Sequence, residues 1–214
     1  MEEDAEFFLM VITVGSTNFE ALINKLLNNQ LIQILPPSNI KLLIQIGNQP
    51  KPETANLITN HTNIQLVIFN YSDSIDHLLQ HANLIITHAG AGSILSAINP
   101  IQPSPLTTTH IQVTPEYTLE IKPTTTTRRP KPRVIVVPNP GLMDNHQIDL
   151  AQQISNLGLA YSCSIDQLFP TIQKALLSPP PQSSSSASEL DPTPGPIKFR
   201  NLLDQQVGFS TSHT

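Results

Sequence analysis

The sequence predicts an α/β fold, a Rossmann-like parallel sheet with helices on both faces. Short apolar runs rich in β-branched residues recur along the chain, and segments with apolar residues at helical spacing separate them. Strands that are apolar throughout are typical of a sheet buried on both faces, and their alternation with amphipathic helices favours parallel pairing. Several runs end in loops rich in glycine and hydroxyl residues, which fits the edge where such sheets bind ligands.

The expected strands are the continuous apolar runs. Each is short, and turn-forming residues such as Gly, Pro, Asn or Ser follow it. The runs are Phe7–Val14, Lys41–Ile46, Ile64–Phe69, the run beginning at Leu84, Arg133–Val137 and the short Ala160–Cys163.

Apolar residues at helical spacing predict a helix after most of these strands. Asn18 is a candidate N-cap for the first helix, and Ser93 either caps its own helix or donates to a ligand. The helices are expected to start near Phe19, at Asp73, at Ser93, before Ile148 and at Ser164 or Asp166, the last running to about Leu177.

The chain is expected to form one α/β domain over residues 1–177, followed by a Ser/Pro linker at 178–196 and an amphipathic tail at 197–214. A Thr- and Pro-rich stretch at 99–132 cannot form a regular helix and is too long for an ordinary connection. We interpret it as an inserted surface loop, in which partial alternation from His110 to Ile121 allows a hairpin. The tail either folds back on the domain or docks on a partner.

Composition argues against several classes of function. The 214 residues carry a net charge of −5, and basic residues cluster only at 128–133, so nucleic-acid binding is not expected. Cys163 is the only cysteine, which rules out an intrachain disulfide and favours a reducing compartment. No apolar run approaches the ~20 residues that span a bilayer, and the acidic N-terminus lacks a signal-peptide pattern.

The run from Leu84 breaks at His88-Ala89-Gly90-Ala91-Gly92-Ser93, a strand, a tight loop and the start of a helix. Glycines let a ligand approach the backbone, and the free N–H groups of a helix N-terminus favour an anion such as phosphate. A plain turn without a ligand explains the local pattern equally well. A dinucleotide fingerprint needs a third glycine where Leu95 stands, so a nicotinamide or flavin cofactor is disfavoured.

Three loops should converge at the carboxyl edge of the sheet: Gly15–Asn18, His88–Ser93 and Asn139–Gln147. Their side chains are mostly neutral donors and acceptors, which suits a sugar better than a metal. Asp144 and His146 could ligate a metal, but two ligands without a third make a weak site. Asp144 is the better candidate for an N-cap of the helix that follows.

Four separate segments resemble one family: Ile12–Thr17, His88–Ser93, Val136–Asn139 and Leu142–Gln147. Together they closely resemble the catalytic subunit of the eukaryotic UDP-N-acetylglucosamine transferase, which adds the second sugar to the dolichol-linked oligosaccharide. That family is similar to the donor-binding half of the bacterial glycosyltransferase that makes the peptidoglycan lipid intermediate. The resemblance extends over most of the expected α/β domain and excludes the Thr/Pro-rich insertion and the Ser/Pro linker.

The resemblance implies a GT-B C-terminal, donor-binding half. In that family an inverting transfer moves N-acetylglucosamine from UDP-N-acetylglucosamine to N-acetylglucosaminyl-diphosphodolichol and forms a β1-4 link. The family also implies a membrane-anchored, acceptor-binding subunit that recruits this chain from the cytoplasm to the cytosolic face of the endoplasmic reticulum. The expected partners are therefore that subunit, the UDP-sugar donor and the dolichyl-diphosphate-linked acceptor.

The resemblance also assigns roles to residues of the phosphate and sugar sites. The donor diphosphate would lie at Gly90, Ala91, Gly92 and Ser93. These groups would stabilise the leaving group as negative charge develops, so neither a metal nor another cofactor is expected. The sugar hydroxyls would be read by Asn145, His146 and Gln147.

Further roles follow for the nucleoside end and the cleft. Phe69 and Tyr71 would lie near the uracil, partly through backbone groups, and Gly15, Ser16 and Thr17 would face the cleft between the subunits. Relatives usually carry a glutamate on the ribose hydroxyls where this chain has Ser96. A serine makes one hydrogen bond there but no charge-assisted pair, which predicts a donor affinity weaker by ~1–3 kcal/mol.

His88 is the local candidate for a general base, although a histidine that hydrogen-bonds the loop or the phosphate explains it better. Two alternatives to the transferase subunit stay open. One is a non-catalytic sugar-nucleotide-binding or scaffold subunit, which Ser96 and the insertion favour. The other is a different transferase or an epimerase that acts on a water-soluble sugar without a second subunit.

Overall fold

The computed structural model describes residues 7–53, 61–100, 107–123, 130–141 and 146–178. Its centre is a six-stranded parallel sheet with the strand order β3-β2-β1-β4-β7-β8. The parallel sheet predicted from the continuous apolar runs is therefore confirmed. The strands are β1 (Phe7–Thr13), β2 (Asn39–Gln45), β3 (Ile64–Phe69), β4 (Leu84–His88), β7 (Arg133–Val137) and β8 (Tyr161–Ser162).

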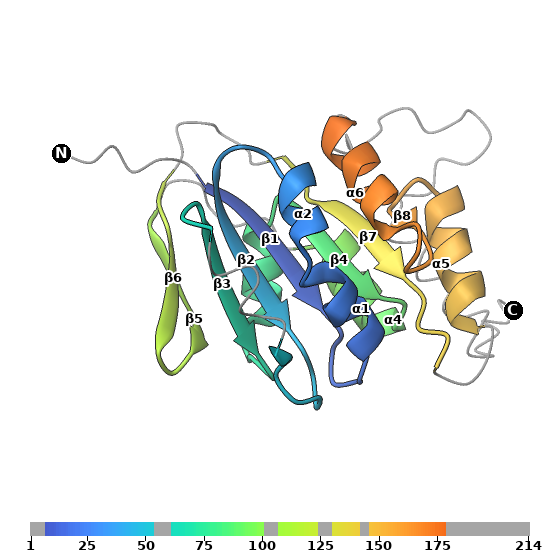
Figure 1. Cartoon of the computed structure of the whole chain (residues 1–214), viewed down its shortest axis with the longest axis horizontal. Helices are drawn as coiled ribbons and strands as arrows, with labels where there is room; N and C mark the ends of the chain where they lie inside the picture. The colour runs from blue at the N-terminus through green and yellow to red at the C-terminus, as the bar shows by residue number, and fades with distance from the viewer. Residues whose placement is uncertain (1–6, 54–60, 101–106, 124–129, 142–145, 179–214) are drawn as a thin grey trace, which may run out of the picture.

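Helices cover both faces of this sheet, as predicted. One face packs against α1 (Glu20–Leu26), α2 (Asn29–Ile34) and α6 (Leu168–Leu177), which lie in front of the strands in Figure 1. The other face packs against α3 (Ile75–His81), α4 (Ala91–Ile98) and α5 (His146–Asn156).

The side chains of each strand point alternately to the two covered faces of the sheet, which explains why the strands are apolar throughout. In β1, Met10 and Ile12 belong to the core beneath α1, α2 and α6, whereas Leu9 and Val11 belong to the core on the opposite face. Successive side chains of a strand point to opposite faces, so a sheet covered on both sides needs apolar residues at every position.

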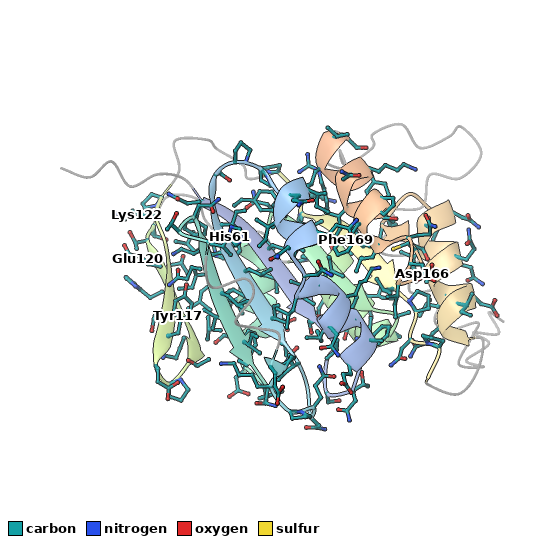
Figure 2. The ribbon with its side chains drawn as sticks, in the orientation of Figure 1. His61, Tyr117, Glu120, Lys122, Asp166 and Phe169 are labelled. Atoms are coloured by element: carbon teal, nitrogen blue, oxygen red, sulfur yellow. The ribbon has the colours of Figure 1, made fainter. Side chains whose placement is uncertain are left out.

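Part of the segment expected as a surface loop instead belongs to the core. The strands β5 (Thr109–Thr114) and β6 (Tyr117–Ile121) form an antiparallel hairpin, as the alternation from His110 to Ile121 indicated. The Tyr117 hydroxyl donates to Oε1 of Gln65 on β3 over 3.2 Å, and Figure 2 shows Tyr117 and Glu120 on this outlying hairpin. The buried side of the hairpin consists of Ile111, Val113, Leu119 and Ile121.

Several predicted boundaries were wrong. The first turn of α4 begins at Ala91 with Gly90 as N-cap, so Ser93 lies inside the helix and does not cap it. Phe19 is the N-cap of α1, with no side-chain capping bond, so Asn18 is not the cap either. The last helix begins at Leu168 rather than at residue 164 or 166, which places Pro170 in the first turn, where a missing N–H costs no hydrogen bond.

The short helix α2 was not predicted. It has only six residues, too few for a helical period to stand out, and it begins where the Asn28 side chain accepts from the N–H of Gln30 over 3.0 Å. Within the described part of the chain, no helix has the length and apolar character to cross a membrane.

Candidate functional site

The sheet topology itself marks one position where a ligand is expected. From β1 the strand order runs to β2 and β3 on one side and to β4, β7 and β8 on the other. Open parallel sheets bind ligands at the carboxyl ends of the strands, at the point where the order reverses. In this chain that point lies between the loop after β1 and the loop after β4, and the arrowheads of both strands reach the same edge in Figure 1.

These two loops contact each other, as predicted for the carboxyl edge. A Cβ placed on Gly15 would lie 3.0 Å from Cε1 of His88 and 3.3 Å from Oγ of Ser93. A Cβ on Gly90 would lie 2.3 Å from Nε2 of His88. The imidazole of His88 is therefore enclosed by glycines of both loops, and neither glycine can be replaced without moving the ring.

His88 is buried, with an exposed fraction of 5%. Burial lowers the pKa of His88 below its ordinary 6.5, because it disfavours the charged imidazolium, and a hydrogen bond with the Thr13 backbone partly opposes this effect. The ring is consequently neutral at physiological pH. This placement suits a side chain that spaces two loops, and it leaves little surface for contact with an acceptor.

The loop after β1 is held firmly by the end of β2. Thr13 and Gln45 are paired by the strand register, and the Thr13 hydroxyl donates to Oε1 of Gln45 and accepts from the N–H of Gly15. The side chain of Asn48 donates to the Ser16 carbonyl over 3.0 Å. These bonds fix the loop at the carboxyl edge of the sheet, beside the switch point.

Two further contacts from the loop after β2 complete this support. Gly47 has φ +64°, and a Cβ there would lie 2.3 Å from the Thr17 carbonyl oxygen, so only glycine fits. Oε1 of Gln49 accepts from the N–H of Phe19 over 3.0 Å. The hydroxyl of Thr17 is itself engaged, since it donates to the Val14 carbonyl over 2.7 Å.

On the opposite side of the loop after β1, Asn139 ties it to the loop after β7. Nδ2 of Asn139 donates to the Asn18 carbonyl over 3.0 Å, and the N–H of Asn139 donates to Oε1 of Gln147 over the same distance. The three loops predicted to converge therefore meet at this edge, with Gln147 fixed by the loop after β7.

The turn into α4 has a different character. Gly90 is the N-cap and carries no side chain, so the first N–H groups of α4 receive no side-chain cap. Gly92 is exposed, and a Cβ placed on it would meet nothing within 4 Å. The N–H groups at the start of α4 are uncapped, and the fold itself does not require the glycine beside them. Such a helix N-terminus is a suitable binding site for an anion.

The remaining predicted residues fall into three groups. Phe69 is a buried core residue, and its carbonyl accepts from the N–H of Ile46. Tyr71, beyond the end of β3, is 70% exposed, and Ser96 is half-buried on α4. Asn145 lies outside the described residues, and so does the side chain of His146.

Several buried polar residues at this edge were not predicted as part of the site. They lie where polar residues end or follow apolar strands, which was the available signal. They are Thr13, Gln45 and Gln49, and Asn139, which belongs to one of the predicted loops, is buried with them. Across the residues that the structure describes, no group of three His, Cys, Asp or Glu gathers to hold a metal.

Uncapped N–H groups at the start of α4, at the switch point of an open parallel sheet, are the arrangement in which α/β folds bind phosphate-containing ligands. The glycosyltransferase family 28 C-terminal domain matches residues 9–103. The fold is similar to that in the crystal structure of Acinetobacter baumannii MurG, with a TM-score of 0.55 and 18% identity, covering 82% of this chain and 42% of that one. The chain is therefore the C-terminal, GT-B type half of this fold.

More particularly, the chain is a homologue of the UDP-N-acetylglucosamine transferase subunit ALG13. It is 31% identical to the Mus musculus subunit over 157 residues, which is 72% of this chain and 10% of that protein. It is 30% identical to the Homo sapiens subunit over 182 residues, 83% of this chain and 13% of that protein. The Cryptococcus neoformans subunit is 23% identical, and the match covers 94% of this chain and 98% of that protein.

The extent of these matches differs between the relatives. This chain spans about a tenth of the length of the two mammalian proteins and almost the whole of the fungal one. The similarity to the mammalian subunits therefore concerns one domain of much longer proteins.

Proposed function

We propose that this chain is the donor-binding subunit of an inverting glycosyltransferase. It moves N-acetylglucosamine from UDP-N-acetylglucosamine to N-acetylglucosaminyl-diphosphodolichol, forms a β1-4 link and thereby serves protein N-glycosylation. The name of the relatives, UDP-N-acetylglucosamine transferase subunit, supports this choice of donor.

The observation that carries the proposal is the turn at residues 90–93. Its uncapped N–H groups and the open space at Gly92 lie at the switch point of the sheet, where a diphosphate would be held. As the sugar leaves, negative charge grows on the diphosphate, and fixed backbone donors stabilise that charge without rearrangement. The rigid loop after β1 would form the wall of the cleft toward the acceptor.

The acceptor half is proposed to come from a second, membrane-anchored subunit. That subunit would hold this chain at the cytosolic face of the endoplasmic reticulum membrane and exchange it with the cytoplasm. Deprotonation of the acceptor hydroxyl requires a base near the acceptor. His88 is neutral but enclosed between Gly15 and Gly90, which favours a base on the partner's side.

The test is a transfer assay with the chain assembled with its membrane-anchored subunit. Wild-type protein should transfer N-acetylglucosamine from UDP to a dolichyl-diphosphate acceptor analogue, and Gly92→Asp should abolish transfer, since it places a carboxylate against the diphosphate. Gln152→Glu adds a negative charge to the exposed side of α5 and should leave the rate unchanged. Absence of transfer by the wild-type complex would contradict the proposal.

A second candidate is a sugar-nucleotide-binding or scaffold subunit without turnover. Ser96 favours it, because the first helix after β4 carries no carboxylate for the ribose. Titration calorimetry with UDP-N-acetylglucosamine followed by the transfer assay separates the two: binding without turnover supports the scaffold, and turnover excludes it.

A further inference from the structure

Asn139 lies where the three loops of the carboxyl edge meet, and it is 8% exposed. Its N–H donates to Oε1 of Gln147, and its Nδ2 donates to the carbonyl of Asn18, each over 3.0 Å. Its Oδ1 accepts from the N–H of Gly141, also over 3.0 Å. One residue thus bonds to the loop after β1, to its own loop and to the first turn of α5.

The two side-chain bonds require an amide at this position, whereas the bond to Gln147 needs only a main-chain N–H. The side chain must donate to one carbonyl and accept from one N–H, and it must reach both from a single Cα. Aspartate keeps the acceptor but places a carboxylate against the Asn18 carbonyl, and an apolar residue leaves both partners unpaired. Because the residue is buried, either loss is costly.

The bond to Gln147 also fixes the orientation of the Gln147 amide. A main-chain N–H only donates, so the atom of Gln147 that faces Asn139 is the oxygen. The NH₂ group is therefore the end of the amide that remains to donate to a ligand. An amide turned the other way would offer an acceptor instead.

We propose that Asn139 is a positioning residue for recognition of the donor sugar. Its main-chain N–H holds Gln147 with the NH₂ group available to a sugar oxygen. Its side chain bonds to the loop after β1 and to its own loop, and thereby fixes the position of that N–H. The inference rests on the proposed function, since it concerns the sugar of the same nucleotide-sugar donor.

The test compares two ligands on the full chain assembled with its partner subunit. Calorimetry measures the dissociation constants of UDP and of UDP-N-acetylglucosamine for the wild type and for Asn139→Asp. UDP binding should change by less than about twofold, because the turn at residues 90–93 is untouched. UDP-N-acetylglucosamine should bind about tenfold more weakly, because loss of the bond to the Asn18 carbonyl shifts the N–H of residue 139, and Gln147 then loses one hydrogen bond to the sugar.

Two further variants make the result specific. Gln147→Glu still accepts from the N–H of Asn139 but has no donor, so it should reproduce the selective loss without breaking any contact between the loops. Asn63→Asp removes the same type of bond, from Nδ2 to the Ser38 carbonyl over 3.2 Å, at the opposite edge of the sheet. It should change neither dissociation constant.

Equal weakening of both ligands in Asn139→Asp would overturn the inference, since that is the result of general loosening. Unchanged affinities in Gln147→Glu would overturn it as well, even if Asn139→Asp failed to fold. A wild-type complex that binds neither ligand would contradict the proposed function itself and this inference with it.

Discussion

The loops after β1 and after β4 lie against each other, and both contain glycine, yet they differ in how their polar groups are used. The first is bonded to its neighbours through Thr13, Asn48, Gln49 and Asn139. The turn into α4 has an N-cap without a side chain, and its first N–H groups have no side-chain cap. The fold therefore completes the first loop by itself, and we propose that a ligand completes the second.

The glycines show the same difference. Only glycine fits at position 47, because a Cβ there would lie 2.3 Å from the backbone oxygen of Thr17. Gly92 meets no such obstacle within 4 Å. A glycine without a steric reason inside a helix lowers stability by roughly 0.5–1 kcal/mol relative to alanine, so its presence points to the approach of a ligand.

The largest expected effect concerns the support that the loop after β2 gives to the loop after β1. Gly47→Ala would force a left-handed backbone on alanine and press its Cβ against the Thr17 carbonyl. We expect the free energy of unfolding to fall by about 2–4 kcal/mol, from the backbone strain and the overpacking together. Denaturant titration measures the loss, and a variant as stable as the wild type would show that the loop is not held as described.

The second effect separates stability from binding. Gly92→Ala should leave stability unchanged or raise it by up to about 1 kcal/mol, since alanine favours the helix. Its Cβ tilts toward the helix N-terminus, where the diphosphate would lie. UDP affinity should fall about tenfold or more by calorimetry. If this variant bound UDP as tightly as the wild type, the proposed difference between the two loops would be contradicted.

The third prediction concerns the other end of α4. Ser96→Glu supplies the carboxylate that the resemblance to the transferase family leads us to expect at the ribose, and residue 96 is only half-buried, so a longer side chain has room. Affinity for uridine nucleotides should rise about fivefold or more, the effect of a charge-assisted hydrogen bond. A deoxyribose analogue of UDP should show no such gain, which serves as the control. Equal gains for both nucleotides would exclude a ribose contact.

The smallest effect is a pH dependence from His88, which separates the loops. Its pKa is lowered from 6.5 by burial, so below pH 6.5 the unfolded chain binds a proton that the folded chain does not. The free energy of unfolding should therefore decrease as the pH falls from 6.5 toward the folded pKa. Chemical unfolding at several pH values should show a shallower decrease in His88→Gln, and an identical decrease would remove His88 as its source.

Much of the fold was predictable because the strands are apolar on both faces, and the glycine turns marked the edge of the sheet. The support of the loop after β1 was not, since it depends on strand register. Thr13 meets Gln45 only because β1 and β2 pair as they do, and a shift of one residue would separate them. Likewise, the partner of Asn139 lies 121 residues earlier in the chain, beyond the reach of local patterns.

The most direct test of the contrast is amide NMR of the full chain titrated with UDP and, separately, with uridine. If the turn into α4 is completed by a diphosphate, the N–H signals of Ala91, Gly92 and Ser93 should shift with UDP and remain in place with uridine. The N–H of Gly15, bonded to Thr13, should move little with either ligand. Equal shifts with uridine, or shifts confined to the loop after β1, would contradict the account.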